Sequence, residues 1–171
     1  MKPMPMLQNF ESRVISIIDQ ISVGPAPTTI KEMRMILKKF DAILNVSNSP
    51  VPGDIMDHRK NPYLQIPVMD ACGIMIPVES LITATTFGLL CLENQRHLLI
   101  HCSAGLSRSP SFTIVLLMIH QELTFNQATE LVLSRNSAWI SSINDDLLSE
   151  KNMLPLLRYF NKPEAWYSRN Q

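Results

Sequence analysis

A cysteine and an arginine separated by five residues, Cys102 and Arg108, are the strongest chemical feature of this sequence. They stand in the segment His-Cys-Ser-Ala-Gly-Leu-Ser-Arg-Ser, residues 101–109. The arginine guanidinium is planar, permanently charged and able to bind two phosphoryl oxygens at once, which a lysine cannot do. A cysteine thiolate is a strong nucleophile. The pair therefore predicts a phosphate-binding site with a nucleophile at its base.

The elements around this pair have the order that such a site needs. An apolar run at 98–100, a short loop containing Gly105 and an apolar-rich run at 112–119 predict a strand, a tight loop and a helix. Pro110 falls in the first helical turn, where proline is tolerated. Backbone N–H groups at a helix N-terminus are unpaired and attract anions. We expect the loop to bind phosphate together with Arg108, through Ser103, Ala104, Gly105, Leu106 and Ser107.

Cys102 is the predicted nucleophile. Helix N-termini and nearby cations favour the thiolate form of a cysteine, so we expect a thiolate at neutral pH. Ser109 follows the arginine and is placed to donate a hydrogen bond to the sulfur, which would stabilise the thiolate as a leaving group. Without Arg108 and Gly105, a cysteine after an apolar strand would be interpreted as a small buried hydrophobe.

A thiolate that attacks a phosphate monoester needs a general acid for the leaving oxygen. Asp70 follows the apolar run 66–69 and opens a loop, the position where α/β folds carry chemistry. The alternative is that Asp70 caps a turn. Asp54 and Asp57, in a proline-rich loop, are the other candidate acids. The predicted reaction has two steps through a cysteinyl-phosphate and uses neither metal nor cofactor.

The chain resembles the cysteine-based protein phosphatases, and within them the small dual-specificity branch. Their motif is His-Cys, two residues, Gly, two residues, Arg, then Ser or Thr. The segments 22–24, 43–46, 63–68 and 123–135 are similar to the family as well, so the resemblance covers about residues 12–160. Each fixed motif position is matched, by His101, Cys102, Gly105, Arg108 and Ser109.

The resemblance implies roles for further residues. Asp70 lies at a fitting distance for the family's general acid, and His101 matches a histidine that orders the loop through backbone contacts. Asn144 matches an asparagine that braces the phosphate loop, although Ile143 stands where many relatives have proline. The expected activity is dual-specificity dephosphorylation of phosphotyrosine and phosphoserine or phosphothreonine.

Other functions fit the sequence less well. The loop lacks the lysines that phosphoinositide phosphatases of the superfamily often carry, and the balanced charge argues against an RNA 5′-phosphatase. A catalytically idle phospho-binding module typically loses the cysteine, arginine or acid, and all three are present. A sulfurtransferase shares the plan of strand, cysteine loop and arginine, but the position of Asp70 and the helix after Ser109 suit a phosphatase better.

Composition limits the partners. The chain has 171 residues, 46% hydrophobic, with fifteen basic and fifteen acidic side chains, so no charge excess points to nucleic acid or an anionic membrane. No apolar run approaches a membrane span. Three cysteines, one of them a thiolate nucleophile, suit a reducing compartment. We expect a soluble cytoplasmic monomer that binds phosphorylated protein and does not insert into a membrane.

Alternating elements predict a single α/β domain over 1–171, with a central, mostly parallel, twisted sheet of four to five strands flanked by helices. The core is expected over about 12–160, with a C-terminal tail at 161–171. Residues 14–17 and 21–23 fit two short strands or one helical stripe. Helices are expected over 31–40, over 81–94 with Ser80 as N-cap, and over 145–160, kinked or split at Pro155. Thr124 and Gln127 predict a capping box for a helix that ends near Arg135.

Several residues near the motif have both a structural and a functional interpretation. Cys72 either packs or forms a reversible disulfide with Cys102 that would protect the nucleophile. Cys91 is expected in a helix core. Trp139 is expected either at the pocket rim or in the core. Arg59 and Lys60 are expected to be solvated loop charges rather than a substrate contact.

Overall fold

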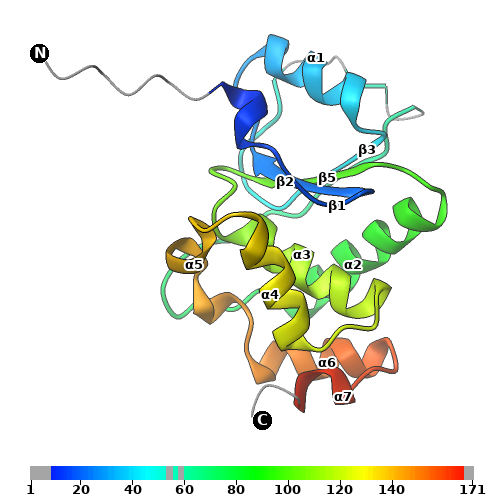
Figure 1. The fold of residues 1–171 in the computed structure, drawn as a ribbon, viewed down its shortest axis with the longest axis vertical. Coiled ribbons are helices and arrows are strands. Elements are labelled where there is room, and N and C mark those ends of the chain that lie inside the picture. Colours follow the sequence, from blue (N-terminus) through cyan, green and yellow to red (C-terminus); the bar gives the residue numbers. More distant parts are fainter. Residues whose placement is uncertain (1–8, 53–55, 58–59, 168–171) are drawn as a thin grey trace, which may run out of the picture.

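The computed structural model describes residues 9–52, 56–57 and 60–167. Its centre is a five-stranded sheet with the strand order β1-β2-β5-β3-β4 (Figure 1). The strands span Ile15–Ile18 (β1), Ile21–Pro25 (β2), Ala42–Asn45 (β3), Tyr63–Gln65 (β4) and Leu98–Cys102 (β5). Helices flank this sheet, so the predicted α/β architecture with four to five strands is confirmed.

Only the first strand pair is antiparallel. β1 and β2 form a hairpin, whereas β2 with β5, β5 with β3, and β3 with β4 are parallel. The two short apolar runs at 14–17 and 21–23 are therefore strands and not a helical stripe. The parallel strands end at one edge of the sheet, and β5 lies between β2 and β3 with all five of its residues buried. This central strand carries Cys102 at its carboxyl end.

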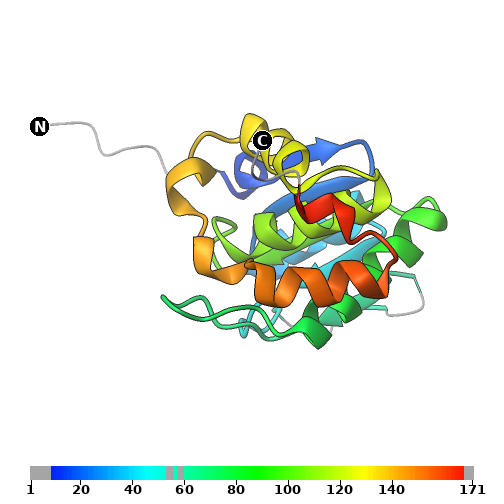
Figure 2. The same ribbon diagram turned by 90° about the horizontal axis from the view of Figure 1, so that it is seen from below.

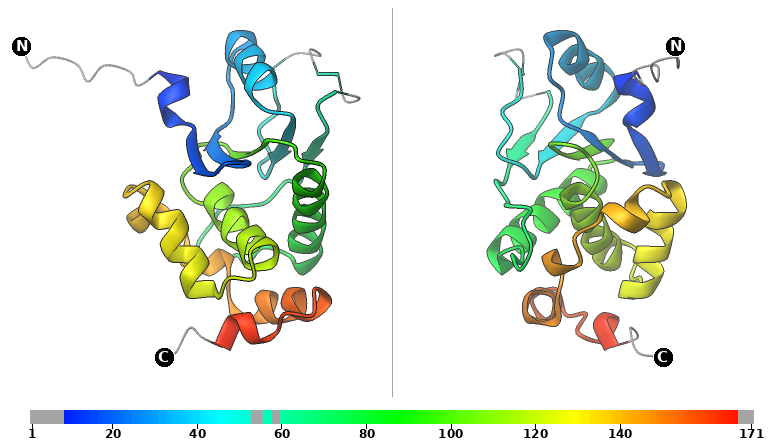
Figure 3. Two further views of the ribbon diagram at one scale, coloured as in Figure 1. Left: turned by 45° about the vertical axis from the view of Figure 1, so that its right-hand side comes forward. Right: turned by 90° about the vertical axis from the view of Figure 1, so that its left-hand side faces the viewer.

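The two faces of the sheet have separate hydrophobic cores. On one face, η1 (Phe10–Arg13) and α1 (Ile30–Lys39) cover a small core that includes Ile43 and Leu99. The other face is covered by a larger helical layer (Figures 2 and 3). This layer contains α2 (Val78–Glu93), α3 (Arg108–His120), α4 (Phe125–Arg135) and, below them, α6 (Glu150–Tyr159).

The C-terminal region differs from the prediction of a helix over 145–160 that Pro155 kinks or splits. After α5 (Trp139–Ser142), the chain forms a 3-10 turn, η2 (Asp145–Leu147), and then α6. The break falls before Ser149, because Ser149 and Asn152 form a capping box that begins a new helix. Pro155 lies inside α6, which continues through it.

Part of the expected tail is structured. The short helix α7 (Glu164–Tyr167) packs Trp166 against Phe125 of α4, with ring centroids 4.8 Å apart. Trp166 is 6% exposed, so this segment belongs to the large core. Residues 168–171 lie outside the described part of the chain.

Some of the predicted helix and strand ends are confirmed, and others are wrong. The capping box of Thr124 and Gln127 is present at α4, as predicted. The predicted N-cap at Ser80 is wrong: α2 begins at Val78, with Pro77 as its N-cap residue. In the segment 63–68, which is similar to the family, the strand β4 ends at Gln65, because the chain after it carries Pro67, which has no N–H to donate to a sheet.

Candidate active site

The segment between β5 and α3 forms the predicted tight loop. Gly105 has a φ of +74°, in the left-handed region that favours glycine. A Cβ there would lie 2.6 Å from the carbonyl carbon of Gly24 and 2.7 Å from the nitrogen of Pro25. Both the backbone conformation and the close approach to β2 therefore require glycine. The loop is thereby held against the end of the neighbouring strand.

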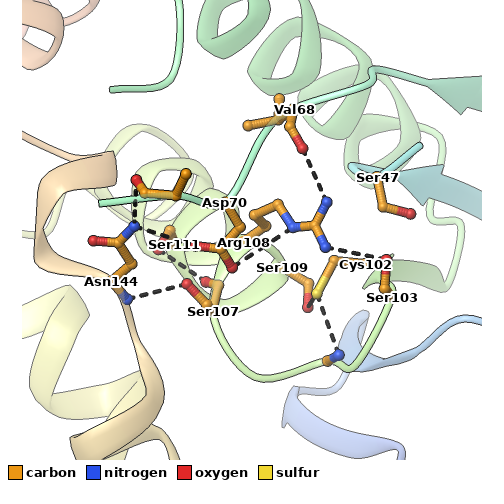
Figure 4. A network of polar contacts seen from close by, with 12 residues as sticks. Ser47, Val68, Asp70, Cys102, Ser103, Ser107, Arg108, Ser109, Ser111 and Asn144 are labelled. Atoms are coloured by element: carbon orange, nitrogen blue, oxygen red, sulfur yellow. Dashed lines mark hydrogen bonds and ion pairs between the residues drawn. The ribbon is translucent and has the colours of Figure 1, made fainter. Parts of the chain in front are cut away.

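Cys102 lies at the base of this loop and is 2% exposed. Its Sγ accepts hydrogen bonds from the Gly105 N–H at 3.2 Å and the Ser109 hydroxyl at 3.3 Å (Figure 4). Both donors stabilise negative charge on sulfur, because each directs a hydrogen toward it. The expected contact between Ser109 and the sulfur is therefore present in the structure.

Arg108 connects the phosphate loop to the loop that carries Asp70. Its Nη1 donates to the Val68 carbonyl at 2.9 Å and its Nη2 donates to the Ser103 hydroxyl at 3.1 Å. Its Nε lies 3.7 Å from Asp70 Oδ2. The side chain is 13% exposed. Arg108 is thus an ion-pair partner inside the site and not a surface charge (Figure 4).

Asn144 holds the same two loops from the opposite side. Its side-chain amide donates to Asp70 Oδ1 at 3.2 Å and to the Ala71 carbonyl at 3.1 Å. Its backbone N–H donates to the Ser107 hydroxyl at 3.0 Å. Asp70 is therefore placed by Arg108 and Asn144 together, close to the phosphate loop. The structure brings together the nucleophile, arginine, acid and asparagine that the sequence predicts.

His101 is completely buried in β5. Its Nδ1 lies 3.5 Å from the Cys102 carbonyl oxygen. Burial lowers the pKa of His101 to about 4, although the contact with Cys102 opposes this shift. The imidazole is neutral at pH 7. This position fits the expected structural support of the loop rather than proton transfer.

Two further contacts of the loop, made by Trp139 and Ser49, are not predicted by the sequence. Trp139 is 1% exposed, and its indole N–H donates to the Gly105 carbonyl at 2.9 Å. It therefore lies in the core and not at the rim. Ser49, after β3, has its hydroxyl 2.8 Å from that of Ser103. These contacts join segments 34 and 54 residues apart, and no local sequence signal indicates them.

Other candidates lie away from the sulfur. Cys91 is buried in α2, and burial raises its pKa to about 11, so it stays a thiol. Cys72 is exposed, so the expectation that it packs is wrong, and all three cysteines are free. Asp57 forms a 3.9 Å ion pair with the exposed Lys60. Asp54 and Arg59 lie outside the described residues.

A groove of about 790 Å³ lies beside the Asp70 loop. Its walls include Gly73 and Met75 from that loop and Asp146 from η2, and the Gly73 N–H donates to Asp146 Oδ2 at 2.7 Å. Neither Cys102 nor Arg108 lines it. Within the described ranges there is no cluster of three or more His, Cys, Asp or Glu side chains suited to a metal ion. In the same ranges, no helix has the length and apolarity needed to cross a bilayer.

Comparison with known proteins agrees with this arrangement. The model of the family "Dual specificity phosphatase, catalytic domain" matches residues 21–149. A search of curated proteins finds no match. Among solved structures, the active form of Tk-PTP is 19% identical, with a TM-score of 0.66 and coverage of 89% of this chain and 97% of that chain.

Two other solved structures share the fold. Human DUSP28 is 18% identical, with a TM-score of 0.60 and coverage of 86% of this chain and 92% of that chain. PTPMT1, solved in complex with PI(5)P, is 16% identical, with a TM-score of 0.65 and coverage of 93% of this chain and 99% of that chain.

Proposed function

Because the chain belongs to the dual-specificity phosphatase catalytic-domain family, we propose that it is a metal-independent phosphate monoester hydrolase that dephosphorylates tyrosine and serine or threonine residues of proteins. The observation that carries the proposal is the convergence of four side chains around one loop. Ser109 Oγ lies 3.3 Å from Cys102 Sγ, and Arg108 Nε lies 3.7 Å from Asp70 Oδ2.

In the first step, Cys102 Sγ attacks phosphorus and forms an S–P bond. The bond from phosphorus to the ester oxygen breaks, and Asp70 transfers its proton to that oxygen. Arg108 and the loop amides bind the three equatorial oxygens, whose negative charge persists through the transition state. The loop leads into the N-terminus of α3 at Arg108, where the helix dipole also favours an anion.

In the second step, water attacks the phosphorus of the cysteinyl-phosphate. Asp70, now deprotonated, takes a proton from this water, and the S–P bond breaks. The departing electron pair stays on Cys102 Sγ. The Ser109 hydroxyl and the Gly105 N–H both donate to this sulfur, so they stabilise the thiolate that leaves. Inorganic phosphate then dissociates.

The charge around the site supports a phosphoprotein substrate. Arg108 is the one cationic side chain in the segment 101–109, because His101 is neutral at pH 7. The loop therefore offers no second cation for a further phosphate group. A phosphoinositide, the ligand class seen with PTPMT1, is the second candidate substrate. We further propose that the chain acts as a single catalytic domain, a monomer in the cytoplasm.

Steady-state hydrolysis of a small aryl phosphate in EDTA between pH 5 and 8 tests the reaction. We expect turnover in the parent protein, none in Cys102→Ser and reduced turnover in Asp70→Asn. No turnover in the parent, with binding of a phosphopeptide retained, would instead indicate an idle binding module. Turnover that EDTA abolishes would contradict the metal-independent reaction.

The substrate class needs a separate comparison. The parent protein is assayed with tyrosine-, serine- and threonine-phosphorylated peptides and with PI(5)P in micelles, and the kcat/KM values are compared. We expect higher values for the peptides. A higher kcat/KM for the lipid would reject the phosphoprotein assignment and leave the phosphatase reaction intact.

A further inference from the structure

We infer that Trp139 is a positioning residue for the phosphate-binding loop, because it fixes the peptide unit that directs the Leu106 N–H toward the phosphate. This inference rests on the proposed function for its link to catalysis. Its structural basis is the hydrogen bond of 2.9 Å from the indole Nε1–H to the Gly105 carbonyl.

The carbonyl groups of the loop follow an alternating pattern. The Ser103 carbonyl accepts from the Ala26 N–H at 3.1 Å. The Gly105 carbonyl accepts from Trp139, and the Ser107 carbonyl accepts from the Ser111 N–H at 3.1 Å. Every second carbonyl is therefore held by a donor outside the loop, from the residue after β2, from α5 and from α3 in turn.

This pattern determines where the amides point. The C=O and N–H groups of a trans peptide point in opposite directions, and the described residues contain no cis peptide. Carbonyls held outward at Ser103, Gly105 and Ser107 therefore turn the next amides inward, those of Ala104, Leu106 and Arg108. The Gly105 N–H is already directed at Cys102 Sγ. The inward amides are the donors left to bind phosphate oxygens.

Of these three carbonyls, only that of Gly105 is held by a side chain alone. The Ala26 and Ser111 N–H donors are backbone groups, which substitution does not remove, and the Ser111 hydroxyl is a second donor to the Ser107 carbonyl, at 2.9 Å. Trp139 is also rigidly placed, because its ring is 1% exposed within the large core. A buried indole N–H needs a hydrogen-bond acceptor, so the Gly105 carbonyl is held in place by the buried ring. The loop peptide following Gly105 is thus oriented by a side chain from a separate helix.

The experiment compares Trp139→Phe with Trp166→Phe. The chain has two tryptophans, both buried, so the two variants make the same chemical change in the same core. Phenylalanine keeps an aromatic ring and removes the indole N–H. The readouts are kcat on an aryl phosphate and the inhibition constant of inorganic phosphate, measured well below the melting temperature of each variant.

We expect Trp139→Phe to lower kcat and raise the phosphate inhibition constant about tenfold or more, because one loop donor loses its alignment. Trp166→Phe should change neither value by more than about twofold, since an alteration away from the loop leaves its donors in place. Phosphate affinity in Trp139→Phe within about twofold of the parent would overturn the inference, as would equal losses in both variants.

If Trp139→Phe does not fold, a second measurement, made on the parent protein, tests the inference. In nitrogen-15 NMR spectra of the parent, Trp166→Phe assigns the two indole N–H signals. Titration with inorganic phosphate should shift the Trp139 signal, and an unshifted signal at saturating phosphate would overturn the inference. This titration needs no turnover, so it tests the inference about Trp139 independently of catalysis. The proposed function is tested by the hydrolysis assay of the parent protein. Failure of one can therefore be distinguished from failure of the other.

Discussion

Arg108 and Asp70 form an ion pair inside the site. The guanidinium contacts Val68, Ser103 and Asp70, so three of its nitrogens are already engaged. We expect an incoming phosphate dianion to compete with the Asp70 carboxylate for the same cation. Phosphate binding should then weaken the contact between Arg108 and Asp70 and free Asp70 to face the leaving oxygen. The contact that places the proposed acid should therefore also limit phosphate affinity.

The Asp70→Asn variant separates these two effects. Its kcat should fall by roughly 10² to 10⁴, the usual contribution of a placed general acid. Its affinity for inorganic phosphate should rise, because the carboxylate that competes for Arg108 is gone. Steady-state kinetics with phosphate as inhibitor measure both values. Asp57→Asn is the matched control, and a comparable loss of kcat there would transfer the acid role to Asp57.

Ser109→Ala should slow the second step more than the first. The Ser109 hydroxyl donates to Cys102 Sγ, and this bond is strongest when the sulfur leaves as a thiolate. We expect a burst of aryl alcohol followed by slow turnover, with cysteinyl-phosphate detectable by intact mass after rapid acid quench. Ser111→Ala, which removes a hydroxyl bound to the Ser107 carbonyl, is the control. A uniform fall in rate without a burst would contradict this role for Ser109.

At the scale of elements, the phosphate loop depends on how closely it approaches β2. Gly105→Ala should abolish activity and destabilise the fold, because its Cβ would lie 2.6–2.8 Å from backbone atoms of Gly24 and Pro25. Gly73→Ala is a control with the same φ of +74° and no atom within 4 Å of the added Cβ. Thermal unfolding and aryl phosphate hydrolysis of both variants distinguish the steric clash from the strain of φ alone.

In Gly73→Ala, only the backbone strain remains. We expect it to cost about 1–2 kcal/mol, the usual penalty of an L residue in the left-handed region. Equal loss of stability in the two glycine variants would mean that the approach of the loop to β2 is unimportant.

Local signals explain which elements the sequence predicts correctly. The capping box at Thr124 involves residues three apart, and the loop at Cys102 follows from a short spacing, so both are visible in the sequence. The start of α2 and the passage of α6 through Pro155 depend on packing against other elements, which the local residues do not encode. Trp139 and Ser49 reach the loop from distant segments, so their roles appear only after folding.

At the scale of the whole molecule, the site is built on a fully buried strand, β5. β5 is paired on both sides and covered on both faces, and it carries His101 beside the nucleophile. The Nε2 atom of His101 is buried and has no hydrogen-bond partner among the described residues. An imidazolium there would be an uncompensated buried charge, so folding favours the neutral form.

This burial links the stability of the entire domain to pH. The pKa of His101 is about 4 in the folded protein and near 6.5 in an unfolded chain. Between these values the unfolded state binds more protons, so the stabilising contribution is complete above about pH 6.5 and is lost as the pH falls toward 4. The free energy of unfolding should drop by roughly 1–2 kcal/mol from pH 7 to pH 5 on this account.

Denaturant unfolding between pH 5 and 7 measures this slope in the parent protein, in His101→Gln and in His120→Gln. The His101→Gln variant should be less stable at pH 7 and lose most of the slope, since glutamine does not titrate. The exposed His120 should be replaceable without changing the slope. If His101→Gln kept the parent's slope, carboxylates and not His101 would set the acid sensitivity. In that case the neutral imidazole would support the loop without limiting the stability of the fold.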